Sequence, residues 1–273
     1  MLKQRLIFGI LGIIAALAVL IYTTPLVIGC CVAAIALIGM YEFFKVTGLK
    51  KSPAAFVGYA FSAFLYFLVL FCNINTSEYI IILLSAYILA LMTIMVFFHD
   101  KCTFSNAALS FMGTMYISIF FLHIIFIRSS LLGYLNIWLI FISAWATDSF
   151  AYFAGRLFGR HKLCPSISPK KTVEGAIGGT LGCVICICLY VYFCSKYAGI
   201  SANYINAVIL SVFTAVFSQL GDLAASCIKR EHGVKDYGNL IPGHGGVLDR
   251  FDSALLISPL VYYLTQYLPV IFK

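Results

Sequence analysis

Long apolar runs, repeated along almost the whole chain, limit its fold more than any other feature. Each run has roughly the 20 residues that an α-helix needs to cross the hydrocarbon core of a bilayer. A helix pairs its backbone polar groups internally, which lipid requires. We therefore predict an all-α integral membrane protein, a polytopic helical bundle of about nine transmembrane helices, at 6–22, 26–44, 54–72, 78–98, 105–127, 134–155, 174–195, 203–228 and 252–270.

The composition agrees with this prediction, because 62% of the residues are hydrophobic and only 10% are charged. A soluble domain would be about a quarter charged. The formal net charge of +8 would attract anionic lipids or phosphorylated ligands. These bases are scattered between apolar runs, so we expect no nucleic acid as a partner.

The distribution of the bases predicts the orientation of the chain. If the N-terminus is cytoplasmic, fifteen of the 18 Lys and Arg residues fall on the inner side, and only Arg128, Lys196 and Lys273 on the outer side. Such a bias favours the cytoplasm for the base-rich side. We therefore expect the N-terminus and every loop that carries a motif to be cytoplasmic.

The polar residues that suggest chemistry are concentrated after residue 128. We expect 1–128 to be a scaffold that contacts lipid or a second copy of the chain, and 129–273 to hold the site. No low-complexity linker separates them, so we predict one membrane domain. In the first half, Glu42 and Lys45 at i, i+3 are expected to form an intrahelical ion pair. His123 is expected to be packed or interfacial, and His99 with Asp100 to form a solvated turn.

Asp222 is an acid inside an apolar run. Placing a charge there costs roughly 2.5 to 3.5 kcal/mol, so such acids usually serve a function. Helical spacing puts Ser226, Lys229 and Arg230 on the same face as Asp222. An acid and two bases are therefore expected to line one polar cavity.

A glycine-rich loop follows and leads into another apolar run. Glycine lets backbone N–H groups approach a polyanion closely. His244 in this loop could be a base, a phosphate donor or a loop-stabilising group. Asp249 and Asp252 could be ordinary partners of a helix dipole, or could both face one metal ion because they lie at i, i+3.

Two further segments carry polar residues toward the same side. Asp148, Tyr152 and Arg156 share a helical face with Gly155. Asp148 could pair structurally with a base of a neighbouring helix, but the cost of an intramembrane acid favours a functional role. In Ser168–Gly175, a Thr cap and an early Glu explain a helix start, whereas the adjacent lysines 170 and 171 favour a bound phosphate.

The most specific pattern is Ser-x-Ile-Lys-Arg-x4-Lys-Asp-x-Gly-x2-Ile-Pro-x-His-Gly-Gly-Val-x-Asp-Arg-Phe-Asp, from Ser226 to Asp252. It resembles the signature of the phosphatidate cytidylyltransferases, also called CDP-diacylglycerol synthases, without a departure. The run Ser-Pro-Lys-Lys-Thr-x-Glu-Gly from Ser168 is also similar to that family. The resemblance rests on specific motifs over about 144–253, and on the span pattern alone before that.

The resemblance implies a cytidylyl transfer from CTP to phosphatidic acid at the cytoplasmic side of a bacterial inner membrane, with membrane lipids or a homodimer as partners. It places Mg²⁺, as one or two cations, on Asp222 and Asp249. Together with the spacing arguments it gives two sets of candidates. The catalytic candidates are Asp222, Asp249, Lys229, Arg230, Lys235 and His244. The substrate-binding candidates are Ser168, Lys170, Lys171, Thr172, Glu174, Asp148, Tyr152, Arg156, Ser226, Asp236, Gly245, Gly246, Arg250 and Asp252.

Two other functions remain open. A related enzyme could use CTP on another lipid, as a polyprenol kinase or an archaeal ether-lipid cytidylyltransferase would. An ion-coupled transporter could also place acids in the membrane. A transporter is expected to have two inverted halves, whereas the polar residues here are concentrated in the second half.

Overall fold

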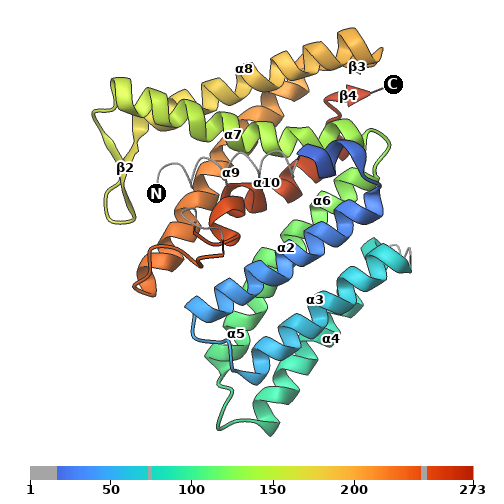
Figure 1. Ribbon diagram of the computed structural model, residues 1–273, viewed down its shortest axis with the longest axis vertical. Coiled ribbons are helices and arrows are strands. Elements are labelled where there is room, and N and C mark those ends of the chain that lie inside the picture. The colour runs from blue at the N-terminus through green and yellow to red at the C-terminus, as the bar shows by residue number, and fades with distance from the viewer. Residues whose placement is uncertain (1–16, 73–75, 241–244, 273) are drawn as a thin grey trace. The chain divides into compact units, whose positions relative to one another are not determined.

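The structure is a computed structural model that describes residues 17–72, 76–240 and 245–272. Helices dominate it (Figure 1), at α2 (Pro25–Val46), α3 (Pro53–Phe71), α4 (Thr76–Phe97), α5 (Phe104–Gly113), α6 (Phe120–Ser129), α7 (Gly133–Phe158), α8 (Val173–Ala198), α9 (Tyr204–Glu231) and α10 (Leu248–Tyr267). A π-helical stretch, η1 (Thr114–Ile119), joins α5 to α6. Strands β1 (Lys162–Cys164) and β2 (Ser168–Thr172) form one antiparallel pair, and β3 (Ser201–Ala202) and β4 (Ile271–Phe272) form another. The predicted helical membrane fold is confirmed, with these two small sheets added.

Seven helical segments in the described part of the chain are long and apolar enough to cross a membrane. They include one continuous segment, Phe104–Ser129, made of α5, η1 and α6. The count of nine is not confirmed. The first predicted span, 6–22, lies mostly outside the described residues, and the last one, α10, is not among the seven. The first half of α10 carries Asp249, Arg250 and Asp252, which lower its apolar character.

The chain forms two compact units. Unit 1 consists of Met1–Leu122 and Asp236–Arg250, and unit 2 of His123–Lys235 and Phe251–Lys273. The sequence placed 236–250 in the C-terminal region, whereas this segment packs with the N-terminal helices in the structure.

In unit 1, helix starts follow the capping rules. Thr24 and Ser52 accept hydrogen bonds from the first turns of α2 and α3, and proline follows each cap. Tyr66 and Tyr87 then link helices from within. The Tyr66 hydroxyl donates to the Ser118 carbonyl at 2.9 Å, and the Tyr87 hydroxyl lies 2.8 Å from the hydroxyl of Thr114.

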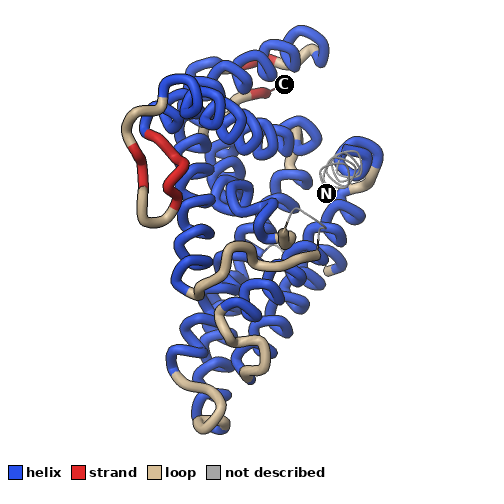
Figure 2. Tube along the Cα trace, turned by 60° about the vertical axis from the view of Figure 1, so that its left-hand side comes forward, coloured by secondary structure: helices blue, strands red, loops and turns tan. Residues whose placement is uncertain are grey.

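In unit 2, glycines of α8 let it approach α7 closely. A Cβ on Gly175 would lie 2.8 Å from the Ala151 carbonyl oxygen, and one on Gly179 would lie 2.8 Å from that of Thr147. The β1–β2 hairpin connects these helices (Figure 2). This packing holds the hairpin between the end of α7 and the start of α8. His123 is buried among aromatic rings, as expected.

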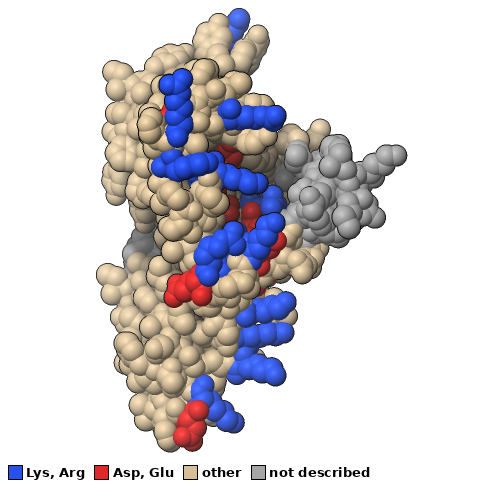
Figure 3. Space-filling model, turned by 90° about the vertical axis from the view of Figure 1, so that its left-hand side faces the viewer, with Lys and Arg blue, Asp and Glu red and all other residues tan. Residues whose placement is uncertain are grey.

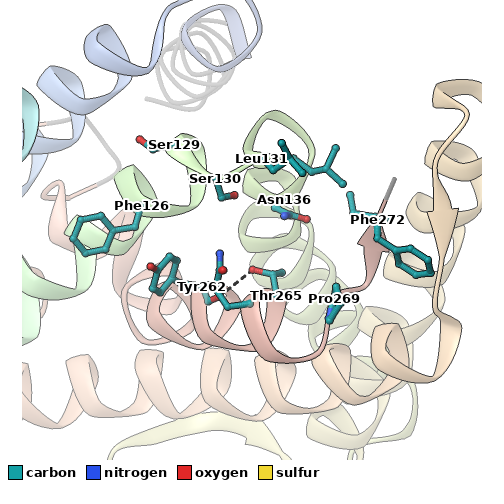
Figure 4. A pocket seen from close by; sticks show the side chains of 12 residues that line it. Phe126, Ser129, Ser130, Leu131, Asn136, Tyr262, Thr265, Pro269 and Phe272 are labelled. Carbon is teal, nitrogen blue, oxygen red and sulfur yellow. Dashed lines mark hydrogen bonds between the residues drawn. The ribbon is translucent and has the colours of Figure 1, made fainter. Parts of the chain in front are cut away.

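Unit 2 also contains a cavity of about 520 Å³ between the end of α6, the start of α7 and the end of α10 (Figure 4). Ser130, Asn136 and Thr265 give its wall some polar character, and the Thr265 hydroxyl already donates to the Tyr262 carbonyl. Among the described residues, no predicted site residue lines this cavity. This cavity therefore does not contribute to the predicted site.

Candidate active site

Asp222 of α9 is the centre of a charged group in unit 2. Its Oδ2 lies 2.6 Å from the Nζ of Lys171, which β2 carries, and the Ser226 hydroxyl is 3.5 Å from its Oδ1. The side chains of Lys171 and Asp222 are 25% and 33% exposed. The ion pair thus joins the hairpin to α9 while its atoms stay accessible to a ligand.

Two more carboxylates lie near enough for their charges to act on one another. Asp148 of α7 is repelled by the charge of Asp222 and attracted by that of Lys171. Asp252 of α10 is repelled by Asp222 and Asp148 and attracted by Lys229. Three helices and a hairpin therefore bring together residues that the sequence had placed on separate polar faces.

A glycine makes the contact between α9 and α10 possible. A Cβ on Gly221 would lie 2.7 Å from the carbonyl oxygen of Asp252, closer than real Cβ contacts come. Gln219 ties α9 to α8, because its amide nitrogen donates to the Ala176 carbonyl at 3.3 Å. Asp222 is thus held between two helix contacts. The sequence analysis did not select Gln219, although a polar side chain in an apolar run was visible.

The polar stripe predicted on α9 divides at the C-terminal end of the helix. Lys229 is buried, at 8% exposure, and acts electrostatically on Asp252. Arg230 is exposed and donates to the Val234 carbonyl at 3.1 Å, where α9 ends. Arg230 therefore fastens the turn that follows α9, which ends at Glu231.

The residues of the β1–β2 hairpin have mixed roles. Thr172 is the predicted cap of α8 and accepts from the Gly175 amide at 3.1 Å. Glu174 binds His161, with 2.7 Å between its Oε1 and the His161 Nδ1. Glu174 thus fastens the start of the hairpin to α8. The sequence did not reveal that His161 is its partner. Ser168 is half-buried and Lys170 exposed on β2.

The predicted α7 stripe continues from Asp148 to Tyr152 and Arg156, near the end of the helix. Tyr152 and Arg156 are exposed and bind each other, with the Arg156 Nη1 donating to the Tyr152 hydroxyl at 3.2 Å. Only Asp148 of this stripe interacts with the charges around Asp222. A substrate role for Tyr152 and Arg156 stays a prediction.

The described part of the glycine-rich loop that lies in unit 1, 236–240 and 245–246, is bound by Asp249. Asp249 is 8% exposed, and its Oδ2 accepts from the Tyr237 amide at 2.8 Å and from the Gly246 amide at 3.0 Å. Gly245 has a φ of +84°, which favours glycine. Lys235 in unit 2, and Asp236 and Arg250 in unit 1, are exposed. His244 lies outside the described residues.

Glu42 is the residue of unit 1 whose role the sequence analysis misjudged. The predicted ion pair with Lys45 is wrong for this structure, because the Glu42 carboxylate accepts from the amides of Val247 and Leu248 at 3.0 and 2.8 Å. Glu42 is 4% exposed. Its position in an apolar run was the same signal that singled out Asp222, but a nearby lysine offered a simpler explanation.

The donor set around Asp222 suits Mg²⁺, which the resemblance implies. Mg²⁺ binds through one or two carboxylates and completes its shell with water and substrate phosphate. Ser218, one turn before Asp222, has a fully buried hydroxyl with no hydrogen-bond partner among the described residues. Within the same residues, no group of three or more His, Cys, Asp or Glu side chains is arranged to hold a metal ion. The residues around Asp222 thus fit a cation that is also coordinated by a bound ligand. The shared binding of one ion by Asp222 and Asp249 stays a prediction.

Bases accompany the acids on the surface. On the face drawn in Figure 3, Lys and Arg side chains are frequent and Asp and Glu side chains lie among them, while most of the remaining described surface there is uncharged. Bases beside carboxylates suit a metal-bound polyphosphate, because the bases neutralise phosphate oxygens.

Comparison with known proteins gives the family. The model of the cytidylyltransferase family matches residues 3–268, nearly the whole chain. The chain belongs to this family. As a member of the cytidylyltransferase family with seven described apolar helices, it is a multi-pass membrane protein.

Relatives within the cytidylyltransferase family are bacterial phosphatidate cytidylyltransferases. The protein of Bacillus subtilis strain 168 is 42% identical over 178 residues, which are 65% of each chain. That of Staphylococcus haemolyticus is 41% identical over 162 residues, or 59% of this chain and 60% of the relative. The protein of Haemophilus influenzae is 34% identical over 294 aligned residues, covering 96% of this chain and 98% of the relative. The chain thus matches less than two thirds of the first two relatives and almost all of the third.

Proposed function

We propose that this protein transfers the cytidylyl group of CTP to phosphatidic acid and releases pyrophosphate, at the cytoplasmic face of a bacterial inner membrane. The observation that carries the proposal is the accessible Lys171–Asp222 pair, 2.6 Å apart, with the carboxyl groups of Asp148 and Asp252 near enough to interact with it electrostatically. Membership of the cytidylyltransferase family and the names of the bacterial relatives support CTP and phosphatidate as the substrates.

In the reaction, an oxygen of the lipid phosphate forms a bond to the α-phosphorus of CTP. The bond from that phosphorus to the oxygen bridging to the β-phosphate breaks, and pyrophosphate leaves with the electron pair. The attacking oxygen is already anionic, so no strong general base is needed. The barrier comes mainly from charge repulsion and alignment, which fixed cations and positioned phosphates lower.

Asp222 and Asp249 would hold Mg²⁺, which when bound neutralises charge on the phosphate oxygens. Lys171 pairs with Asp222 in the structure. When the phosphate groups of a substrate bind, the Lys171 ammonium group can leave the Asp222 carboxylate and bind a phosphate oxygen. Lys170, Lys229, Lys235 and Arg250 are the other bases proposed to bind phosphates of CTP and lipid. The positive charge of buried Lys229 offsets the negative charge of Asp252 when no ligand is present.

The surface of α8 suits a lipid substrate. Ile177, Leu181 and Ile185 are exposed, on the helix that begins directly after Lys171 and Thr172. A bilayer around these residues would keep acyl chains in hydrocarbon while the lipid phosphate reaches the basic hairpin. A substrate with one charged end and two apolar chains therefore matches the arrangement.

The test measures pyrophosphate release by the purified protein in lipid vesicles, with CTP, with and without phosphatidate, and across a Mg²⁺ titration. We expect release only when all three are present, and label from the α-phosphate of CTP in the product lipid. Label from the γ-phosphate in a lipid monophosphate would instead indicate a lipid kinase. Solute movement across vesicles without pyrophosphate release would indicate a transporter, and full activity in excess chelator would remove the metal from the proposal.

A further inference from the structure

The Glu42 carboxylate binds two backbone amides that lie far along the chain. The proposed reaction does not use this contact. Its Oε1 accepts from the Val247 amide and its Oε2 from the Leu248 amide, at 3.0 and 2.8 Å. The two hydrogen bonds join residues 205 and 206 positions apart within unit 1. Burying a carboxylate is costly unless it is hydrogen-bonded, and both oxygens of Glu42 are.

Leu248 is the first residue of α10. The first amides of a helix have no intrahelical partners, and negative charge is favourable there. A side chain of α2 therefore performs the capping role that a residue just before α10 would normally perform. The contact thus lies at the first residue of the helix that carries Asp249.

Two glycines allow the loop to come this close. A Cβ on Gly238 would lie 2.4 Å from the Glu42 Oε1, and a Cβ on Gly246 would lie 2.5 Å from both carboxylate oxygens. Asp249 fastens the same loop from the other end through Tyr237 and Gly246. Four backbone amides are thus held by two buried carboxylates, one from α2 and one from α10.

We propose that Glu42 is a positioning residue: it holds the backbone at Val247 and Leu248, where the glycine-rich loop ends and α10 begins, and so sets the place of Asp249 and Arg250. Its effect on turnover rests on the proposed function, whereas its effect on the loop does not. Because Glu42 would act through the loop, its loss should lower kcat more than it weakens CTP binding.

The experiment replaces Glu42 by Gln, which keeps the volume but offers one acceptor oxygen to two donors. Lys45→Gln, one turn along α2 at an exposed position, is the matched control. In hydrogen–deuterium exchange, we expect the Gly246–Leu248 amides of Glu42→Gln to exchange about tenfold faster, because charged hydrogen bonds are stronger than neutral ones. The α8 amides should not change. We expect kcat to fall about tenfold with KM for CTP within about twofold, and Lys45→Gln to match the original protein.

A second variant tests the contact from the loop side. Gly238→Ala should loosen the same amides, because its Cβ would overlap the Glu42 carboxylate. In a Glu42→Ala background, Gly238→Ala should add little, since the carboxylate is gone. Additive effects of the two changes would contradict the inference.

The outcomes separate the two proposals. Unchanged exchange in Glu42→Gln, or faster exchange throughout the chain, would overturn the positioning role. Local loosening in a protein that never releases pyrophosphate from CTP and phosphatidate would leave the Glu42 contact standing and overturn the proposed function. Local loosening with a selective loss of kcat would support both.

Discussion

The carboxylates of the two units are held in different ways. Asp222 in unit 2 is a third exposed, and its short contact is with the flexible side chain of Lys171. Glu42 and Asp249 in unit 1 are at most 8% exposed, and their hydrogen bonds come from backbone amides. One group is accessible and its partner can move, whereas the other is buried and its partners are fixed.

This difference indicates which carboxylates can take part in the reaction and which hold the fold together. An accessible ion pair contributes little to stability, about 0 to 1 kcal/mol, and can exchange partners when a ligand arrives. If a buried carboxylate that accepts from two amides is removed, those amides lose their hydrogen-bond acceptor. Each unsatisfied amide then costs about 1 to 3 kcal/mol of folding free energy. We therefore expect variants around Asp222 to lose activity at nearly constant stability, and variants around the loop to lose both.

The largest effect is expected for Asp222→Asn. Loss of one of the two proposed cation ligands should lower pyrophosphate release by about 10³-fold, which corresponds to several kcal/mol of transition-state stabilisation. The thermal midpoint should hardly change. Asp100→Asn, in the exposed His99–Asp100 turn, is the control and should be fully active. An Asp222→Asn protein with near-normal turnover at ordinary Mg²⁺ would remove this residue from the cation site.

Asp249→Ala should lose stability as well as activity. It leaves the amides of Tyr237 and Gly246 without the carboxylate, so unfolding should become easier by about 2 to 4 kcal/mol. Thermal and denaturant unfolding in the same detergent, beside Asp222→Ala, provide the measurement. Equal destabilisation by the two alanine variants would contradict the claim that the carboxylates of the two units differ in their contribution to stability.

Lys171→Gln should have an intermediate effect. Its ammonium group is proposed to pass from Asp222 to a phosphate, so losing it should reduce kcat/KM for CTP by about tenfold, as expected for a charge-assisted contact. Lys170→Gln, at the exposed neighbouring position on β2, should cost only about two- to threefold. Equal losses would mean that the hairpin attracts CTP by its overall charge and that the contact with Asp222 has no special part.

His161→Gln should have the smallest effect. The His161 side chain is 80% exposed. Without the ring, its backbone amide still donates to Glu174 and its carbonyl still accepts from the Val173 amide, so the hairpin stays bound to α8. Turnover should stay within about twofold, as is usual for exposed pairs. A large loss would place His161 in the site and would require a role beyond fastening the hairpin.

Local sequence rules predicted much of the helical structure because the reasons are local. Thr172 caps α8 as expected, and the runs that became α2, α3 and α4 are apolar for the length of a bilayer. The β1–β2 hairpin was missed because 162–172 lacks the alternation of apolar residues that indicates a strand. The predicted last span began at Asp252, whereas α10 begins at Leu248, where Glu42 accepts the first amides.

The sequence by itself determined that this chain is a helical membrane protein, that Asp148 and Asp222 are unusual acids, and that its motifs resemble those of one enzyme family. Each follows from composition, spacing within a single helix, or a contiguous pattern. Only the tertiary structure decided which group each acid meets: Lys171 for Asp222, the loop amides for Asp249, and the start of α10 for Glu42. The physical reason is that a buried carboxylate takes whatever donors the fold brings to it, and backbone amides far along the chain leave no mark in the order of side chains.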